Sequence, residues 1–112
     1  MKICDILKSN PKLKVANGGD LNREVSGVYC CDLLSLVMGR AFADCAWVTV
    51  MGNANSVAVA VLADMACIVI AENMPLDTAA LDKARENGVT VLLSEDAVYP
   101  TARSIDGGGV GA

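Results

Sequence analysis

The chain has 112 residues and a formal net charge of −4, from nine basic and thirteen acidic side chains. Its length predicts a single domain, and its 54% of apolar residues excludes intrinsic disorder, a coiled coil and a collagen-like chain. Sixteen Ala and fourteen Val stand out among the apolar residues. Such small side chains let helices lie close to a sheet, and their surplus suggests more apolar surface than one small domain can hide.

Apolar periodicity and turn residues predict two helices and two strands in the first part of the chain. The helices are expected at residues 2–8 and 32–38, and the strands at residues 13–16 and 25–31. We expect Asp32 to cap the second helix and Gly39 to end it. After the first strand, residues 17–20 (Asn-Gly-Gly-Asp) have the composition of a turn.

The second part of the chain alternates strands with helices. Continuous apolar runs predict buried strands at residues 45–51, 66–71 and 89–93. A helix at residues 77–87 ends at Gly88, and Pro100 takes the first position of a short last helix. Residues 57–64 alternate like a strand, but Asn55 or Ser56 can cap a helix there, and we choose the helix.

This order, α-β-β-α-β-α-β-α-β-α, predicts one domain over residues 1–105 with a largely parallel five-stranded sheet covered on both faces. The Gly-rich residues 106–112 are expected to form a flexible tail. Nineteen uncharged residues at 45–63 approach the length of a membrane span. Their centre, residues 52–56 (Gly-Asn-Ala-Asn-Ser), is a turn and helix start, so we expect no membrane association.

The charged and sulfur-containing residues exclude several kinds of partner. A nucleic-acid surface needs clustered basic residues, and the three lysines at positions 8, 12 and 14 are bounded by Asp5 and Asp20. Five cysteines (4, 30, 31, 45 and 67) form no Cys-x-x-Cys pair, and histidine is absent, so we expect no metal site. No signal peptide is apparent, and reduced thiols in the cytoplasm are the simplest account. Cys30 and Cys31 point to opposite faces of a strand, which disfavours a redox pair.

Several runs of residues together resemble the DRTGG domain family. They are Gly-Gly-Asp at 18–20, REVSGVYCCDLLSLVMGRA at 23–41, WVTVMGNANSVAVAVLADMACIVIAE at 47–72 and DKARENGVTVLLSEDA at 82–97. The letters that name the family are absent as a contiguous string, and Asn17 stands before the Gly pair where a Thr is expected. The resemblance implies a three-layer α/β/α domain similar to the N-terminal domain of HPr kinase/phosphorylase. Relatives occur as accessory modules in phosphotransacetylases and beside CBS domains in pyrophosphatases, where they look regulatory or dimer-forming.

No motif in the sequence demands catalysis. The phosphate-binding Gly-x-x-x-x-Gly-Lys-Ser/Thr loop is absent, and without histidine neither a Ser-His nor a Cys-His pair can form. We therefore expect no enzyme, no catalytic residue and no cofactor. Asp32 is interpreted as a cap, and Arg40 and Asp44 as solvated charges. Met38, Met51 and Met65 are interpreted as core residues.

Two turns are candidate binding sites. At Gly52, Asn53, Asn55 and Ser56, free backbone N–H groups at a helix start attract anions, and Gly52 lets a ligand approach the chain. The alternative there is a plain turn with a helix cap. The second turn holds Gly18, Gly19 and Asp20 near Arg23, and its alternative is a tight turn with a surface ion pair.

Two functions follow from these patterns. The first is a non-catalytic regulatory or interaction module that forms a homodimer, with a further protein partner as an option, because its surplus apolar surface needs cover. The alternative is a small-molecule sensor that binds a nucleotide or another anion at residues 52–56.

Overall fold

A computed structural model describes residues 1–106 of the chain. Five strands form one sheet: β1 (Lys14–Asn17), β2 (Gly27–Cys30), β3 (Cys45–Thr49), β4 (Cys67–Ile70) and β5 (Thr90–Leu93). Five helices surround it: α1 (Ile3–Ser9), α2 (Leu34–Arg40), α3 (Ala54–Leu62), α4 (Thr78–Asn87) and α5 (Val98–Ile105). The element order is the one that the sequence predicts. The expected tail, apart from Asp106, lies outside the described residues.

The strands lie in the order β1-β5-β4-β3-β2, so β1 and β2 are the two edges of the sheet. Neighbours from β2 to β5 are parallel, and β1 pairs antiparallel with β5 through a shifted register between Val15 and Asn17. β3 and β4 lie side by side, with Trp47 opposite Ile68, and α3 connects them. The predicted pairing of the two apolar runs is therefore confirmed.

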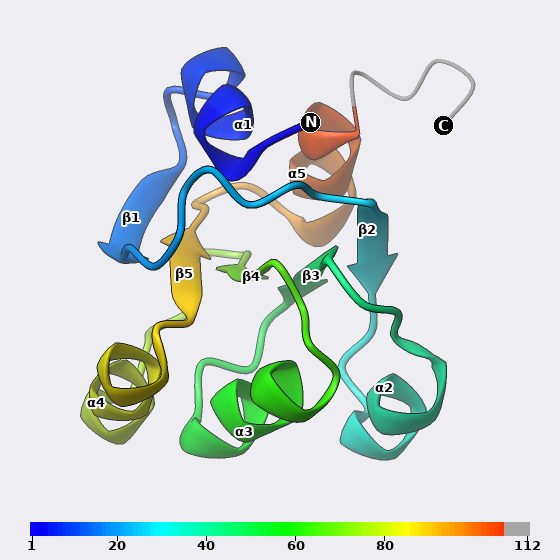
Figure 1. Cartoon of the computed structure of the whole chain (residues 1–112). Coiled ribbons are helices and arrows are strands. Elements are labelled where there is room, and N and C mark those ends of the chain that lie inside the picture. Colours follow the sequence, from blue (N-terminus) through cyan, green and yellow to red (C-terminus); the bar gives the residue numbers. More distant parts are fainter. Residues whose placement is uncertain (107–112) are drawn as a thin grey trace.

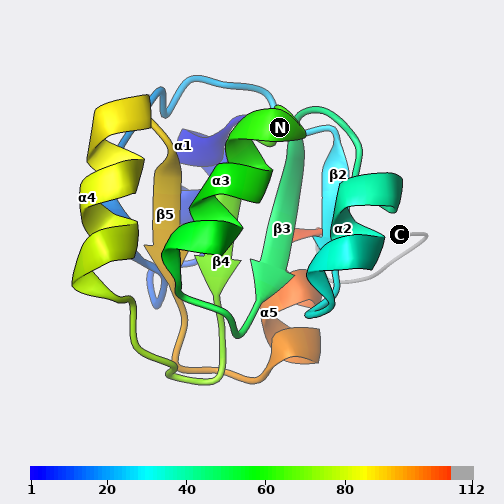
Figure 2. The same ribbon diagram turned by 90° about the horizontal axis from the view of Figure 1, so that it is seen from below.

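Helices cover both faces of the sheet, which makes three layers (Figure 1). The three crossover helices α2, α3 and α4 lie on one face, and α1 and α5 lie on the other (Figures 1 and 2). Buried Trp47, Ile68 and Ile70 face the crossover helices, whereas Val48 and Val69 belong to the core beneath α1 and α5. Small side chains bring the helices close to the sheet: Ala60, Ala80 and Ala84 are fully or almost fully buried against it.

Four details of the predicted elements are wrong. Asn53 is the N-cap of α3, in place of Asn55 or Ser56, because its side chain accepts a hydrogen bond from the Ser56 N–H. Asp32 makes no cap: Leu33 holds that position in α2, which continues past Gly39 to Arg40. Pro100 is the third residue of α5, still within the first turn, where helical N–H groups have no intrahelical partner. Met38, expected in the core, is 49% exposed, although Met65 is buried.

No helix in residues 1–106 combines the length and the apolar character that crossing a membrane requires. The uncharged stretch at 45–63 is divided between β3 and α3, as the turn residues at its centre predict.

Candidate functional site

The turn at residues 52–56 begins where β3 ends. A side chain at Gly52 would clash with the carbonyl oxygen of Pro75, and the Gly52 carbonyl accepts a hydrogen bond from Asp77 N–H at 2.8 Å. The segment between β4 and α4 therefore approaches Gly52 closely and takes the space that glycine leaves.

The remaining residues of this turn build the start of α3. Asn53 Oδ1 accepts hydrogen bonds from the backbone N–H of Ser56 at 3.0 Å and from the Ser56 hydroxyl at 3.2 Å. Ser56 is buried, whereas Asn55 is exposed. The first N–H groups of a helix have no partner within the helix. In α3 these include the N–H groups of Ala54 and Asn55, which precede the Ser56 N–H that bonds the Asn53 cap.

Asp32, which the sequence analysis interpreted as a helix cap, lies at the same end of the sheet with other partners. Asp32 Oδ1 accepts hydrogen bonds from the Thr49 hydroxyl at 2.7 Å and from Val50 N–H at 3.0 Å. Asp32, two residues before α2, therefore ties the start of this helix to the end of β3. Its partners are 17 and 18 residues away in sequence, beyond the reach of local capping patterns.

The strand order affects how ligands could use this end. In open α/β sheets, ligands bind where the order of the parallel strands reverses and neighbouring crossover helices lie on opposite faces. Here β2, β3, β4 and β5 follow one another in sequence across the sheet, and α2, α3 and α4 all cover one face (Figure 2). The described parallel strands therefore have no such reversal.

The second predicted turn lies at the amino end of the sheet. Gly19 N–H donates to Thr90 Oγ1 at 2.9 Å, and a side chain at Gly19 would clash with the carbonyl group of Gly88. Gly18, in contrast, has ordinary space, with Val15 Cγ1 as its neighbour at 3.6 Å. Gly19 thus closes the turn onto the end of α4.

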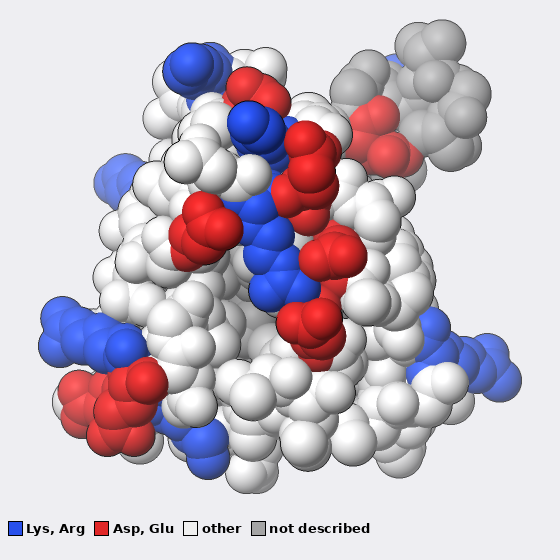
Figure 3. Space-filling model, viewed as in Figure 1, with Lys and Arg blue, Asp and Glu red and all other residues white. Residues whose placement is uncertain are grey.

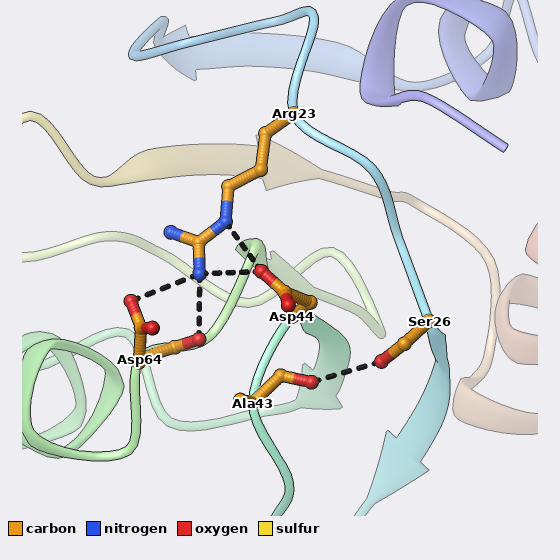
Figure 4. Close-up of polar contacts among 5 residues, drawn as sticks. All are labelled: Arg23, Ser26, Ala43, Asp44 and Asp64. Atoms are coloured by element: carbon orange, nitrogen blue, oxygen red, sulfur yellow. Dashed lines mark hydrogen bonds and ion pairs between the residues drawn. The ribbon is translucent and has the colours of Figure 1, made fainter.

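Arg23 joins this turn to the starts of two central strands (Figure 4). Its Nε and Nη2 donate to Asp44 Oδ1 at 3.0 and 2.8 Å. The same Nη2 donates to Asp64 Oδ1 at 2.9 Å and to the Asp64 carbonyl at 2.7 Å. Arg23 forms ion pairs, but their partners, Asp44 and Asp64, lie outside the turn for which the sequence analysis considered one. Asp44 is correspondingly not a free solvated charge.

Both aspartates hold a backbone conformation that side chains disfavour. Asp44 has φ 63° and Asp64 has φ 54°, in the left-handed region. Asp64 follows α3 in a Schellman motif, with Asp64 N–H donating to Val61 O and Met65 N–H to Ala60 O. The end of α4 has the same bonds but uses Gly88, with φ 65°. An L-residue in this conformation costs about 1–2 kcal/mol, which contacts with Arg23 can offset.

Arg23 and the two aspartates set the electrostatics of the amino end, on a face where basic and acidic side chains lie together (Figure 3). Burial would lower the pKa of Arg23, but hydrogen bonds to Asp44 and Asp64 raise it above its usual value overall. A cavity of about 150 Å³ beside it is lined by residues that include Asp20, Asp64, Asn87 and Thr90. Carboxylates and the carbonyl ends of α3 and α4 surround this cavity, which disfavours an anion there.

The thiols provide neither a metal site nor a disulfide. All five cysteines are unpaired, and no group of acidic, Cys or His side chains in residues 1–106 could hold a metal ion. Burial raises the pKa of Cys67 to about 12. Burial, followed by the nearby Asp32 charge, also raises the pKa of Cys30. A raised pKa leaves less of the reactive thiolate at neutral pH.

The comparisons with known proteins agree with this fold. Residues 3–107 match the family described as the DRTGG domain. A similar solved structure contains the CBS and DRTGG domains of the regulatory region of Clostridium perfringens pyrophosphatase, in complex with its activator diadenosine tetraphosphate. It is 12% identical, with a TM-score of 0.76 over 93% of this chain and 45% of that one. A search of curated proteins found no significant match.

Proposed function

This chain belongs to the DRTGG domain family, and we propose that it is a non-catalytic regulatory module that acts as a homodimer. The similar structure comes from a regulatory region, and this chain spans less than half of it. Within residues 1–106, every buried side-chain N or O atom has a hydrogen-bond partner. The two predicted turns are closed by contacts within the chain, which supports a structural role for both.

Exposed apolar side chains in and around α2 carry the proposal. Leu33, Leu36, Met38 and Phe42 are exposed by 57%, 39%, 49% and 41%, and all lie within ten residues in and around α2. We call these four residues the α2 surface. Fully burying one such side chain contributes about 1.5–3 kcal/mol, so covering a half-exposed one contributes about half of that. A two-fold interface buries each side chain that takes part in it twice, once in each copy.

The mass of the wild-type chain in solution tests this proposal. Sedimentation equilibrium at tens of micromolar should give twice the 11.6 kDa of the chain. A dimer that dissociates on dilution supports self-association. A monomer at these concentrations contradicts it.

A small-molecule sensor is the second candidate. The regulatory region from C. perfringens is in complex with a nucleotide activator, and here exposed Asn55 lies in the first turn of α3, where an anion is favoured. A nucleotide or other anion bound at residues 52–56 would meet the N–H groups of Ala54 and Asn55. The ligand would not occupy the space beside Gly52, because Pro75 already fills it.

Thermal-shift measurements with adenine nucleotides test the sensor directly. A ligand at 100 times its dissociation constant adds about 2.7 kcal/mol to the free energy of unfolding. Asn55→Asp places a negative charge at the helix start, which should stabilise α3 but abolish the shift caused by an anion. Asn55→Gln is the neutral control. Absence of a shift in the wild type, or an equal shift in both variants, contradicts the sensor.

We also propose a cytoplasmic location for this module. All five thiols are unpaired, and reduced cysteines are typical of that compartment. Alkylation of the chain inside intact cells before lysis would test this, because a disulfide-bonded population there contradicts the proposal.

A further inference from the structure

We propose that two copies of the chain associate through α2, which packs antiparallel against α2 of the second copy with Leu36 at the centre. This inference rests on the proposed homodimer and identifies its contact surface. The argument uses three observations: the residues on the outer face of α2, the charges at its two ends, and the contrast with the opposite edge of the sheet.

The outer face of α2 is suited to close helix packing. Val37 is fully buried and Leu34 half-buried, which defines the inner face of the helix. At about 100° per residue, Ser35, Leu36 and Gly39 point away from it. No atom lies within 4 Å of the place that a side chain at Gly39 would occupy. The helix backbone at Gly39, one turn from Leu36, is therefore open to close approach by a side chain of a second helix.

The charges at the ends of α2 select an antiparallel arrangement. Asp32 lies just before the helix and Arg40 is its last residue, and both are exposed. A two-fold axis through Leu36 brings Asp32 of one copy toward Arg40 of the other at both ends of the interface. A parallel arrangement would instead place like charges together, which is unfavourable. The surface is therefore complementary to a second copy of itself.

The opposite edge of the sheet is protected against association. β1 contains exposed Lys14, and its register with β5 is interrupted between Val15 and Asn17. Exposed lysines and bulges are devices that keep edge strands from pairing. On the other side, β2 has no charged residue, and α2 lies over it in Figure 2. The self-complementary face of α2 is thus on the side of the molecule that lacks this protection.

Sedimentation equilibrium of matched variants tests the interface. Leu36→Glu places two like charges at the two-fold axis and should weaken dimerisation by about tenfold or more. Leu62→Glu makes the same substitution at a 72%-exposed position on α3 and should leave the dissociation constant unchanged. A wild-type dimer that Leu36→Glu leaves intact overturns this interface but not the proposed homodimer. Loss of the dimer in Leu62→Glu alone also overturns it, because the contact then lies on α3.

A second variant separates association from folding. Gly39→Leu fills open space in the single chain and replaces a poor helix former, so its thermal unfolding temperature should rise when measured at a monomeric concentration. It also blocks close approach of a second helix at this position, so dimerisation should weaken. A Gly39→Leu chain that folds and dimerises like the wild type contradicts helix packing at this position.

Discussion

At the amino end of the sheet, Gly19 lies against the carbonyl group of Gly88, and at the carboxyl end Gly52 lies against that of Pro75. Both ends are therefore closed by a glycine that leaves no room for a side chain. Their polar groups differ. At the amino end, Arg23 joins two carboxylates. At the carboxyl end, Asp32 bonds the end of β3 and Asn53 caps α3, and neither side chain covers the first turn of α3. The comparison shows that Gly19 and Gly52 each mark a close approach of the backbone, and that the neighbouring charges decide whether an anion is favoured.

The largest effect should come from a methyl group at either closing glycine. Gly19→Ala and Gly52→Ala force a side chain against backbone atoms that cannot move aside, so each should lower the free energy of unfolding by about 1–3 kcal/mol. Gly18→Ala is the matched control, because its neighbour lies at an ordinary contact distance. Urea unfolding measures all three. Equal stability of Gly18→Ala and Gly19→Ala would show that the amino end is not closed by this contact.

Arg23→Ala should have the next largest effect. It removes the donors shared by Asp44 and Asp64 and leaves two carboxylates together. Hydrogen bonds to charged groups contribute about 1.5–3 kcal/mol, and the exposure of Asp64 reduces this, so we expect a loss of about 1–2 kcal/mol. Arg23→Lys keeps the charge without the fork of donors and should recover only part of the stability. Full recovery by lysine would assign the effect to charge alone.

Cys67, the first residue of β4, predicts how stability depends on alkaline pH. In the folded chain the pKa of this thiol is raised to about 12. Its contribution to the free energy of unfolding is therefore fully present below the unfolded pKa near 9 and is lost as the pH rises toward 12. The free energy of unfolding should fall by about 1 kcal/mol between pH 9 and pH 10 from this group. Chemical denaturation at the two pH values measures the fall. Cys67→Ala should show a smaller fall, and an equal fall would exclude this thiol as its source.

The smallest expected change in stability concerns the left-handed residues that end α3 and α4. Both have a left-handed residue, Asp64 in one and Gly88 in the other. Asp64→Gly loses an exposed ion pair but relieves the backbone, so stability should change by less than about 1 kcal/mol. Asp64→Ala loses the pair without that relief and should be less stable than Asp64→Gly. The reverse order in thermal unfolding would show that Asp64 is not strained.

Local patterns were sufficient for the order and type of the elements. The apolar runs at residues 45–51 and 66–71 and the stop at Gly88 depend on neighbours within a few positions, and these predictions are confirmed. The partners of the polar residues depend on topology. Arg23 contacts Asp44 and Asp64, 21 and 41 residues away, and only the parallel order of β3 and β4 brings them together.

The two candidate turns show the same limit. The sequence indicated a close approach to the backbone at Gly52 and a tight turn at Gly18 and Gly19, but it could not identify which groups approach either glycine. In the structure this is the Pro75 carbonyl in one case and the Gly88 carbonyl in the other. A bound ligand at Asn55 or near Asp20 remains a prediction. The exposure of Met38 in the α2 surface was missed because this residue was interpreted as part of the core.

Hydrogen exchange at two concentrations tests the homodimer and its interface in one measurement. The amides of a helix that becomes covered exchange more slowly, and uncovered elements are unaffected. The account predicts that raising the wild-type concentration from about 1 µM to about 100 µM, a range that spans a micromolar dissociation constant, slows exchange at residues 33–42. Exchange in β1 and at the start of α3 should stay the same. Equal exchange throughout the chain, or slowing confined to β1, would contradict it.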